Sequence, residues 1–257
     1  MEEMLFYPIA SGSSGNCTYV GTKSTHILVD AGISGKKIET ALSELKNPNI
    51  SAIFVTHEHG DHVLGIGVMA RRYNLPIYAT PKTWQHLPNS VGEIPKPLRH
   101  NIIPNQTIFL QDLAITAFDI PHDAAQPVGY FIETKSQTAA VATDLGYVTD
   151  TIRNILRNAQ VLLIESNHDV DMLKNGNYPA HLKERILSST GHLSNVAAGI
   201  LLVEIANPKL RHIYLGHLSE ENNHPQLAFN TVSNILTINE VSLDISVAKY
   251  NDRLFRW

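Results

Sequence analysis

The sequence is poor in the features that mark exported and membrane proteins. Its 257 residues include one cysteine, Cys17, so no intramolecular disulfide can form, and a reducing cytoplasm is the expected location. No apolar run approaches the roughly 18 residues of a membrane span, and residues 1–5 carry acid where a secretion signal carries base. These shortages predict a cytoplasmic protein without a membrane span.

The chain also lacks a strong excess of charge and any segment that would divide it. Its 24 acidic and 20 basic residues give a formal net charge of −4, so no general basic surface for nucleic acid is expected. A polyanionic substrate would need a local positive field, which divalent ions supply. Because no linker, repeat, low-complexity block or charge run interrupts the chain, we predict one domain over residues 1–257.

Alternating or β-branched runs predict strands, and helical periodicity fills several intervals between them. The predicted strands are residues 17–21, 26–30, 52–56, 77–79, 113–119, 128–133, 138–143, 161–165, 211–215 and 242–248. The predicted helices are residues 36–45, 63–73, 149–158, 180–187, 196–206 and 226–236. Early strands follow one another closely and later ones alternate with helices, which predicts two sheets packed face to face with helices outside.

A dense group of histidines follows the predicted strand 52–56. The run His57-Glu58-His59-Gly60-Asp61-His62 contains three imidazoles and a separate carboxylate within six residues. Imidazole nitrogen and carboxylate oxygen are ligands that zinc, manganese and iron accept, and an exposed loop gains nothing from so many histidines. This run therefore predicts a metal site.

Four more residues of ligand type come directly after predicted strands, namely Asp30, His122, Asp144 and His217. Taken singly, a histidine after a strand is more often a hydrogen-bonded loop residue than a ligand. Together with the histidine run they supply the six or so protein ligands that two adjacent divalent ions require.

The spacing resembles the five-motif signature of the metallo-β-lactamase superfamily: residues 29–32, then His57-x-His59-x-Asp61-His62, His122, Asp144 and His217. Residues 11–16, 30–37, 165–169 and 191–195 further resemble its YycJ branch, also called WalJ or VicX, whose members are cytoplasmic metal-dependent DNA exonucleases. The resemblance implies an α+β fold, the αββα four-layer sandwich of two mixed sheets flanked by helices. One departure lies at residues 247–252, where an arginine is expected soon after the alanine.

The resemblance also implies how the ligands are shared. His57, His59 and His122 would hold one ion, Asp61, His62 and His217 the other, and Asp144 would bridge them. Two such ions would share a hydroxide that attacks the phosphorus in line. Asp30 would fix a ligand imidazole by accepting its second N–H, although capping the turn before Gly32 is an equal alternative.

Outside the ligand set, His192 is the strongest functional prediction, and with Asp61 it is predicted to be catalytic. It precedes Ser194 and Asn195, either of which can cap the helix predicted from residue 196, so an anion can face the helix amides. His192 would then donate to a phosphate oxygen or protonate the leaving alcohol; the alternative is that it packs the loop.

Two further places are candidate substrate contacts. The glycine-rich loop 11–16 carries Ser13, Ser14 and Asn16 and would let a phosphate approach the backbone, but it lacks a G-x-G-x-x-G or Walker pattern, and a structural turn fits as well. His168 would line the substrate channel or be held in a structural network by Glu165 and Asp169.

We therefore predict a phosphodiesterase with two divalent ions, Mn²⁺ or Zn²⁺ with iron possible, whose substrate is DNA degraded from a 5′ end towards the 3′ end. A small-molecule or cyclic-nucleotide phosphodiesterase is the enzymatic alternative, because the same ions and histidine would serve it. A regulatory partner of a cell-wall two-component system, with structural metals, is the alternative of another class.

Overall fold

The computed structural model describes residues 4–248 and 255–256, and the chain divides into two compact units. Unit 1 comprises Met1–Asp119, Ala124–Gln137 and Lys249–Trp257, and unit 2 comprises Ile120–Asp123 and Thr138–Ala248. The prediction of one domain stays a prediction. Within the described part of the chain, no helix is both long enough and apolar enough to cross a membrane.

Unit 1 contains a seven-stranded mixed sheet with the order β14-β1-β2-β3-β4-β5-β6. Its strands are β1 (Leu5–Ala10), β2 (Cys17–Gly21), β3 (His26–Val29), β4 (Ala52–Phe54), β5 (Ile77–Ala79), β6 (Arg99–Asn101) and β14 (Phe255–Arg256). Strands β14, β1, β2 and β3 pair antiparallel, and β3 to β6 pair parallel. Three more antiparallel strands follow, β7 (Thr107–Leu110), β8 (Leu113–Asp119) and β9 (Val128–Glu133).

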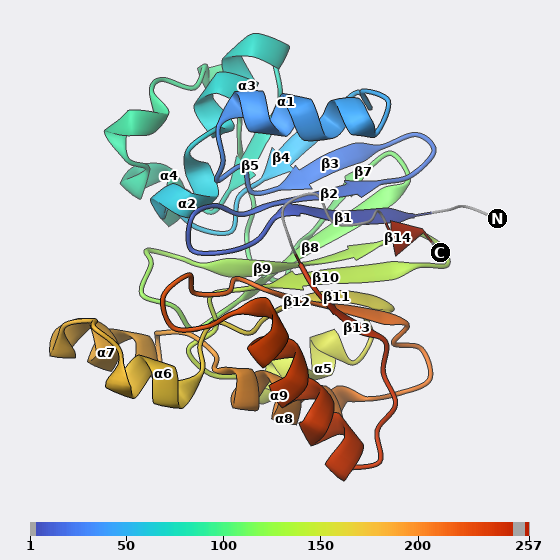
Figure 1. Cartoon of the computed structure of the whole chain (residues 1–257). Coiled ribbons are helices and arrows are strands. Elements are labelled where there is room, and N and C mark those ends of the chain that lie inside the picture. The colour runs from blue at the N-terminus through green and yellow to red at the C-terminus, as the bar shows by residue number, and fades with distance from the viewer. Residues whose placement is uncertain (1–3, 249–254, 257) are drawn as a thin grey trace. The chain divides into compact units, whose positions relative to one another are not determined.

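Helices of unit 1 cover one face of the seven-stranded sheet (Figure 1). They are α1 (Gly35–Glu44), α2 (Gly60–Val63), α3 (Ile66–Tyr73) and α4 (Pro81–His86), with short 3₁₀ turns at Asn89–Val91 and Lys96–Leu98. Helix α1 begins at Ser34, whose hydroxyl accepts from Lys37 N, and α3 ends at Asn74 in the left-handed conformation. Ile38 of α1 and Met69 of α3 are buried in the same core as Ile53 of β4, which fixes these helices on the sheet.

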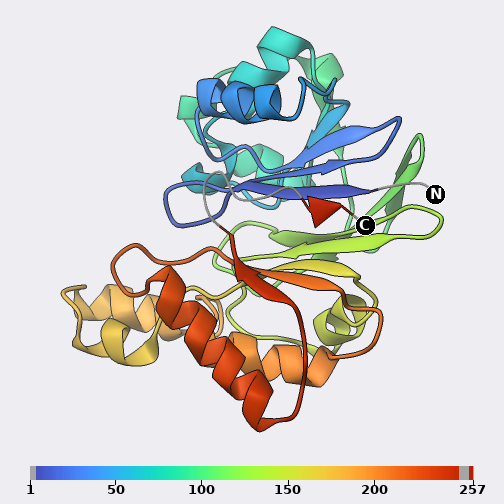
Figure 2. The ribbon, with the colours of Figure 1, turned by 45° about the vertical axis from the view of Figure 1, so that its right-hand side comes forward.

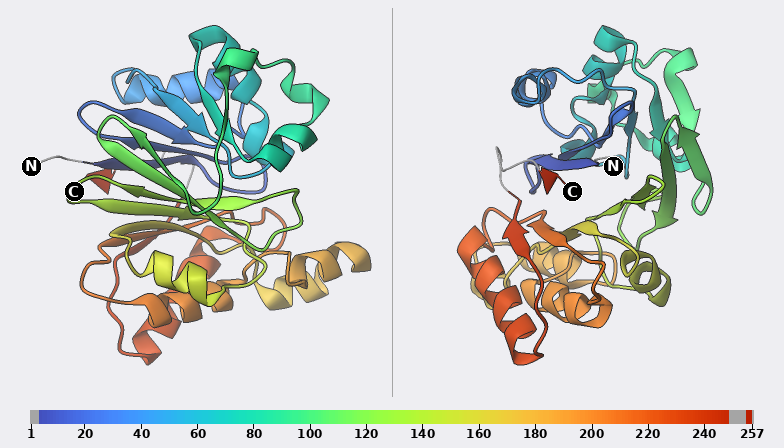
Figure 3. Two further views of the ribbon diagram at one scale, coloured as in Figure 1. Left: turned by 180° about the vertical axis from the view of Figure 1, so that it is seen from behind. Right: turned by 90° about the vertical axis from the view of Figure 1, so that its right-hand side faces the viewer.

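Unit 2 is built on four parallel strands, β10 (Thr138–Ala142), β11 (Val161–Glu165), β12 (His212–Gly216) and β13 (Ile245–Val247). Its helices are α5 (Asp150–Leu156), α6 (Val170–Asn175), α7 (Ala180–Leu187), α8 (Asn195–Ile205) and α9 (Pro225–Ile238). Helices α5, α8 and α9 lie on one face of these strands, and α6 and α7 project together from one end (Figures 2 and 3). Because β10, β11 and β12 are parallel, the loops that follow them emerge at the same edge of the sheet.

The α+β class is confirmed, and most predicted elements lie within one or two residues of the observed ones. The prediction of one helix over residues 63–73 is wrong in one respect. The structure has two helices there, α2 ending at Val63 and α3 beginning at Ile66, with Leu64 and Gly65 between them. A Cβ on Gly65 would lie 2.5 Å from Ile33 O, and Gly65 N donates to Ala31 O at 2.7 Å. This close backbone contact interrupts a helix that the apolar periodicity alone continues.

Four strands were not predicted from the sequence, β1, β6, β7 and β14. Strand β1 contains Pro8, which argues against a strand, yet the register between β1 and β2 shifts between Pro8 and Ala10, so the proline lies at an irregularity that tolerates it. Most of the departure from the family pattern, residues 249–252, lies outside the described residues.

Candidate metal centre

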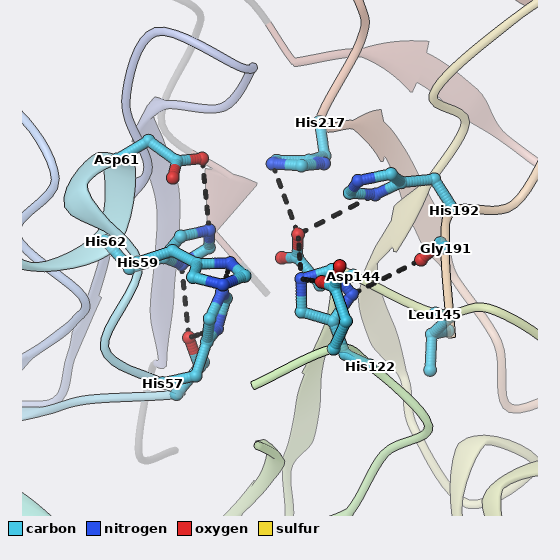
Figure 4. A network of polar contacts seen from close by, with 12 residues as sticks. His57, His59, Asp61, His62, His122, Asp144, Leu145, Gly191, His192 and His217 are labelled. Atoms are coloured by element: carbon cyan, nitrogen blue, oxygen red, sulfur yellow. Dashed lines mark hydrogen bonds and ion pairs between the residues drawn. The ribbon is translucent and has the colours of Figure 1, made fainter. Parts of the chain in front are cut away.

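The predicted ligands of unit 1 lie in the segment that joins β4 to α2. His57 and His59 are in the loop after the strand, and Asp61 and His62 are in the four-residue helix α2. His57 Nε2 lies 3.0 Å from His59 Nδ1, with His57 completely buried. Two ring nitrogens that converge at this distance fit a shared cation, because each offers a lone pair to the same point. Figure 4 shows the three histidine rings gathered with Asp61 beside them.

Asp30 orients the ring of His62. The Nδ1–H of His62 donates to Asp30 Oδ2 at 2.8 Å, while Thr56 donates its backbone N–H and its hydroxyl to the same carboxylate, each at 2.8 Å. The lone pair of His62 is thereby left on Nε2, which lies 3.4 Å from Asp61 Oδ2. Burial raises the pKa of Asp30, against the opposing effect of His62 and Thr56. The carboxylate thus occupies the place expected of a supporting group, and its role toward a metal stays a prediction.

In unit 2, two predicted histidine ligands face one carboxylate oxygen of the third predicted ligand, Asp144. Asp144 follows β10 and His217 follows β12, and both have left-handed backbone conformations, with φ of 61° and 53°. Asp144 Oδ1 lies 3.6 Å from His122 Nε2 and 3.5 Å from His217 Nε2. An oxygen that faces two imidazole nitrogens suits a bridging ligand, and left-handed backbone conformations of residues other than glycine are concentrated at functional sites.

The tautomer of His122 follows from its neighbours. Its Nδ1–H donates to the carbonyl oxygens of Thr190 at 3.1 Å and Gly191 at 3.3 Å, which leaves the lone pair on Nε2. Burial lowers the pKa of His122 and outweighs the attraction of Asp144 and Glu165. The ring is therefore held in the neutral form that a metal ligand requires.

Glu165, the last residue of β11, has contacts with His192 and His217 that the sequence reasoning did not predict. Its Oε1 accepts from His192 Nδ1 and from His217 Nδ1, both at 2.8 Å, and its Oε2 accepts from the backbone N–H groups of Leu145 and Leu193, both at 2.9 Å. Burial alone would raise the pKa of Glu165, but the two histidines hold it well below its usual range. A glutamate ending the otherwise apolar strand Val161–Glu165 was the available signal, because a buried carboxylate has to be paired.

Glu165, Asp144, His192 and His217 each offer a ligand-type atom, all within 4.8 Å of one another. Both oxygens of Glu165 accept hydrogen bonds, which is the arrangement of a carboxylate that supports ligand histidines. Burial opposes the charged form of His192, yet the adjacent Glu165 raises its pKa overall. His192 is thus a partly buried imidazole whose Nδ1–H is held and whose Nε2 side faces away from Glu165, as a proton donor requires.

The predicted substrate residues lie in different settings. Ser194 caps α8 by accepting from Ala197 N, and the buried Asn195 donates its side-chain N–H to Asn223 Oδ1. Both side chains are thus engaged within the protein, and their predicted contact with substrate stays untested. Ser13 and Ser14 are exposed at the tip of their loop.

His168 is buried, and neither ring nitrogen has a hydrogen-bond partner within the part of the chain that the structure describes. Burial lowers the pKa of His168 to about 4. Neither Glu165 nor Asp169 hydrogen-bonds this ring in the described residues, so the network expected around it is not formed by those two side chains.

Comparisons with known proteins identify the family of the chain. The model of the Beta-lactamase superfamily domain matches residues 25–213. The chain is 42% identical to exodeoxyribonuclease YycJ of Bacillus anthracis, over 90% of this chain and 88% of that protein. It is 41% identical to exodeoxyribonuclease WalJ of Streptococcus pneumoniae, over 95% and 92%.

Solved structures share the fold at low identity. The metallo-β-lactamase fold protein YhfI from Bacillus subtilis is 18% identical with a TM-score of 0.71, and Zn²⁺-bound PqqB from Methylobacterium extorquens is 16% identical with a TM-score of 0.71. Each match covers 99% of both chains. The chain therefore belongs to the metallo-β-lactamase superfamily, and the predicted fold is confirmed. Within that superfamily its relatives are the YycJ and WalJ proteins, as the sequence motifs predicted.

Proposed function

We propose that this protein is a cytoplasmic exodeoxyribonuclease that hydrolyses phosphodiester bonds with the help of two divalent ions. The observation that carries the proposal is the 41–42% identity, over at least 90% of the chain, to proteins named exodeoxyribonuclease. The donor sets of both units support it, because they consist of imidazole nitrogens and carboxylate oxygens suited to borderline divalent ions.

The proposed ligand assignment follows the family pattern. One ion would be held by His57, His59 and His122, the other by Asp61, His62 and His217, with Asp144 between them. Zinc, manganese and iron all suit these donors. Bound ions of this kind lower the pKa of an attacking water and neutralise charge on the phosphoryl oxygens.

The chain itself supplies the proton for the leaving group. His192 keeps its Nδ1–H on Glu165, so its Nε2–H is the group that would protonate the leaving alcohol oxygen. Glu165 stabilises the imidazolium of His192, and its second oxygen is fixed by two backbone amides, which holds the pair in one orientation. The exposed Ser13 and Ser14 are the proposed contacts for the DNA backbone.

The test is to strip the full-length protein of metal, restore it with Mn²⁺ or Zn²⁺ in parallel, and supply 5′-labelled and 3′-labelled duplex DNA. Single-stranded RNA and a chromogenic phosphodiester are tested in parallel as alternative substrates. We expect stepwise release of nucleotides from the 5′ end of DNA. The His59→Ala variant should lose this activity, and the matched control His86→Ala, at an exposed histidine of α4, should keep it.

The other outcomes are informative. Turnover of only the small ester would reassign the protein as a small-molecule phosphodiesterase, and degradation from the 3′ end would overturn the proposed direction. Hydrolysis of none of these substrates by fully loaded protein would favour a regulatory partner with structural metals.

A further inference from the structure

The loop of residues 11–16, between β1 and β2, is fastened to the helix that carries Asp61. Asn16 is only 5% exposed; its backbone N–H donates to Asp61 O at 2.8 Å, and its carbonyl oxygen accepts from Gly32 N at 2.7 Å. A Cβ on Gly32 would lie 1.6 Å from Asp61 O, so three segments of unit 1 meet here backbone to backbone. The loop is therefore part of the support of α2.

The side chain of Asn16 points at the ligand-type atoms of α2. Its Nδ2 lies 3.1 Å from His62 Nε2 and 3.3 Å from Asp61 Oδ2, and it is also near Gly12 O at 3.1 Å and Asp61 O at 3.4 Å. Its Oδ1 accepts from Gly12 N at 3.1 Å. All neighbours of Nδ2 are acceptors, and the neighbour of Oδ1 is a donor, so the hydrogen-bond network defines the orientation of the amide.

A neutral amide is well suited to this place. The Asp61 side chain is 26% exposed, so burial alone does not hold its rotamer, and a hydrogen bond to Oδ2 restricts it. A lysine or arginine would make a similar hydrogen bond but would repel a cation bound by Asp61 and His62. An asparagine donates without adding charge.

We propose that Asn16 is a positioning residue that orients Asp61 for one divalent ion. Asp61 Oδ2 can accept from Asn16 and still offer a second lone pair to the ion, whereas a bound ion would replace the contact of Asn16 with His62 Nε2. This inference rests on the proposed function for the identity of the site. It also gives the loop a role different from the predicted phosphate cradle: Asn16 is its anchor, and Ser13 and Ser14 are exposed.

The test measures Mn²⁺ binding to metal-stripped, full-length protein in the absence of DNA, for wild type, Asn16→Ala, Asn16→Asp and the control Asn230→Ala, at an exposed asparagine of α9. We expect Asn16→Ala to lower the affinity for one of the two ions by about 10- to 100-fold, as loss of a supporting hydrogen bond does. The affinity for the other ion should stay unchanged. The Mn²⁺-induced rise in Tm should shrink accordingly. Asn230→Ala should bind both ions as wild type does.

Asn16→Asp should change the response in the opposite direction. Its carboxylate would face Asp61 Oδ2 and the carbonyl oxygens of Gly12 and Asp61, so the stripped protein should melt at a lower temperature than wild type. The added carboxylate would lie beside two ligand atoms and attract the cation. The Mn²⁺-induced rise in Tm should then be larger than in wild type. Opposite changes for Ala and Asp are not expected of a residue that only braces the loop.

Equal losses of Tm in both variants, with and without Mn²⁺, would show that Asn16 is only a structural brace and would overturn the inference. So would binding of both ions by Asn16→Ala with wild-type affinity. Should Asn16→Ala fail to fold, Asn16→Asp decides alone, since it keeps the size of the side chain and an acceptor for Gly12 N. Failure of the proposed function is seen separately, as wild-type protein that binds two ions and degrades no DNA.

Discussion

At the scale of single residues, Glu165 shows how a buried charge is made tolerable and useful. Two imidazoles and two backbone amides donate to its carboxylate, which is fully buried. Such a group is costly without partners, so its complete satisfaction explains why the strand can end in glutamate. The same bonds fix the ring orientation of His192 and His217, and hence which nitrogen of each ring points away.

We predict that Glu165→Gln keeps the fold but lowers kcat on DNA by about 10- to 100-fold, the range found when a carboxylate supporting a ligand histidine is lost. The glutamine side chain has one acceptor oxygen where glutamate has two. Its NH₂ group would face hydrogen-bond donors that the second carboxylate oxygen now accepts from. Circular dichroism measures whether the fold is kept, and steady-state kinetics on DNA measures kcat. Glu184→Gln, at an exposed position of α7, is the control, and kcat of Glu165→Gln within twofold of wild type would contradict this role.

His168 leads to a prediction about acid stability. Burial lowers its pKa to about 4, below the ordinary value of 6.5, so the folded protein binds fewer protons than the unfolded chain between these values. The contribution of neutral His168 to stability is thus fully present above pH 6.5 and is lost as the pH falls towards 4. His168→Leu removes this loss of stability. It also removes two ring nitrogens that have no hydrogen-bond partner among the described residues.

The expected result is a variant whose free energy of unfolding exceeds that of wild type by about 1 kcal/mol at pH 7.5 and by more at pH 4.5. Urea unfolding at both values measures it, with the exposed His181→Leu as control. The prediction would be wrong if the variant and wild type differed in free energy of unfolding by the same amount at both pH values. A stable His168→Leu that no longer binds DNA would instead support the substrate role predicted for this residue.

At the scale of elements, local patterns predict where side chains of the right kind emerge, but not which of them meet. Asp144 and His217 were predicted from their places after strands, because the carboxyl ends of parallel strands share an edge. Glu165 was not, since within β11 it reads only as the end of a buried strand. Its meaning depends on histidines 27 and 52 positions away in the chain.

The same limit explains the loop 11–16 and the divided helix. Glycines and hydroxyls indicate a turn near phosphate, whereas the decisive contacts of Asn16 are with Asp61 and His62, 45 and 46 positions away. The apolar period over residues 63–73 is continuous, yet the close approach of Gly65 to Ile33 separates α2 from α3. The hydrophobic periodicity of a sequence does not predict backbone contacts between distant segments.

At the scale of the whole molecule, charge and site must be reconciled. A chain with a net charge of −4 has no electrostatic reason to bind DNA, so the proposed substrate has to be attracted locally. The predicted ligands are divided, with four in unit 1 and three in unit 2. On the proposed assignment, two divalent ions would add four positive charges where the phosphate is cleaved, which offsets the net charge of the chain.

We therefore predict that metal removal affects stability and DNA binding together. At an ion concentration about 100 times its Kd, each bound ion stabilises the folded state by about 2.7 kcal/mol, which corresponds to roughly 5–10 °C in Tm for a chain of this size. Differential scanning fluorimetry of stripped and Mn²⁺-loaded protein measures this shift. Fluorescence anisotropy with an exonuclease-resistant phosphorothioate duplex measures binding, which should be at least tenfold tighter with Mn²⁺, whereas His86→Ala behaves as wild type. A Tm that does not respond to Mn²⁺ would remove the ions from the proposal; a Tm that rises without any gain in DNA affinity would leave them with a purely structural role.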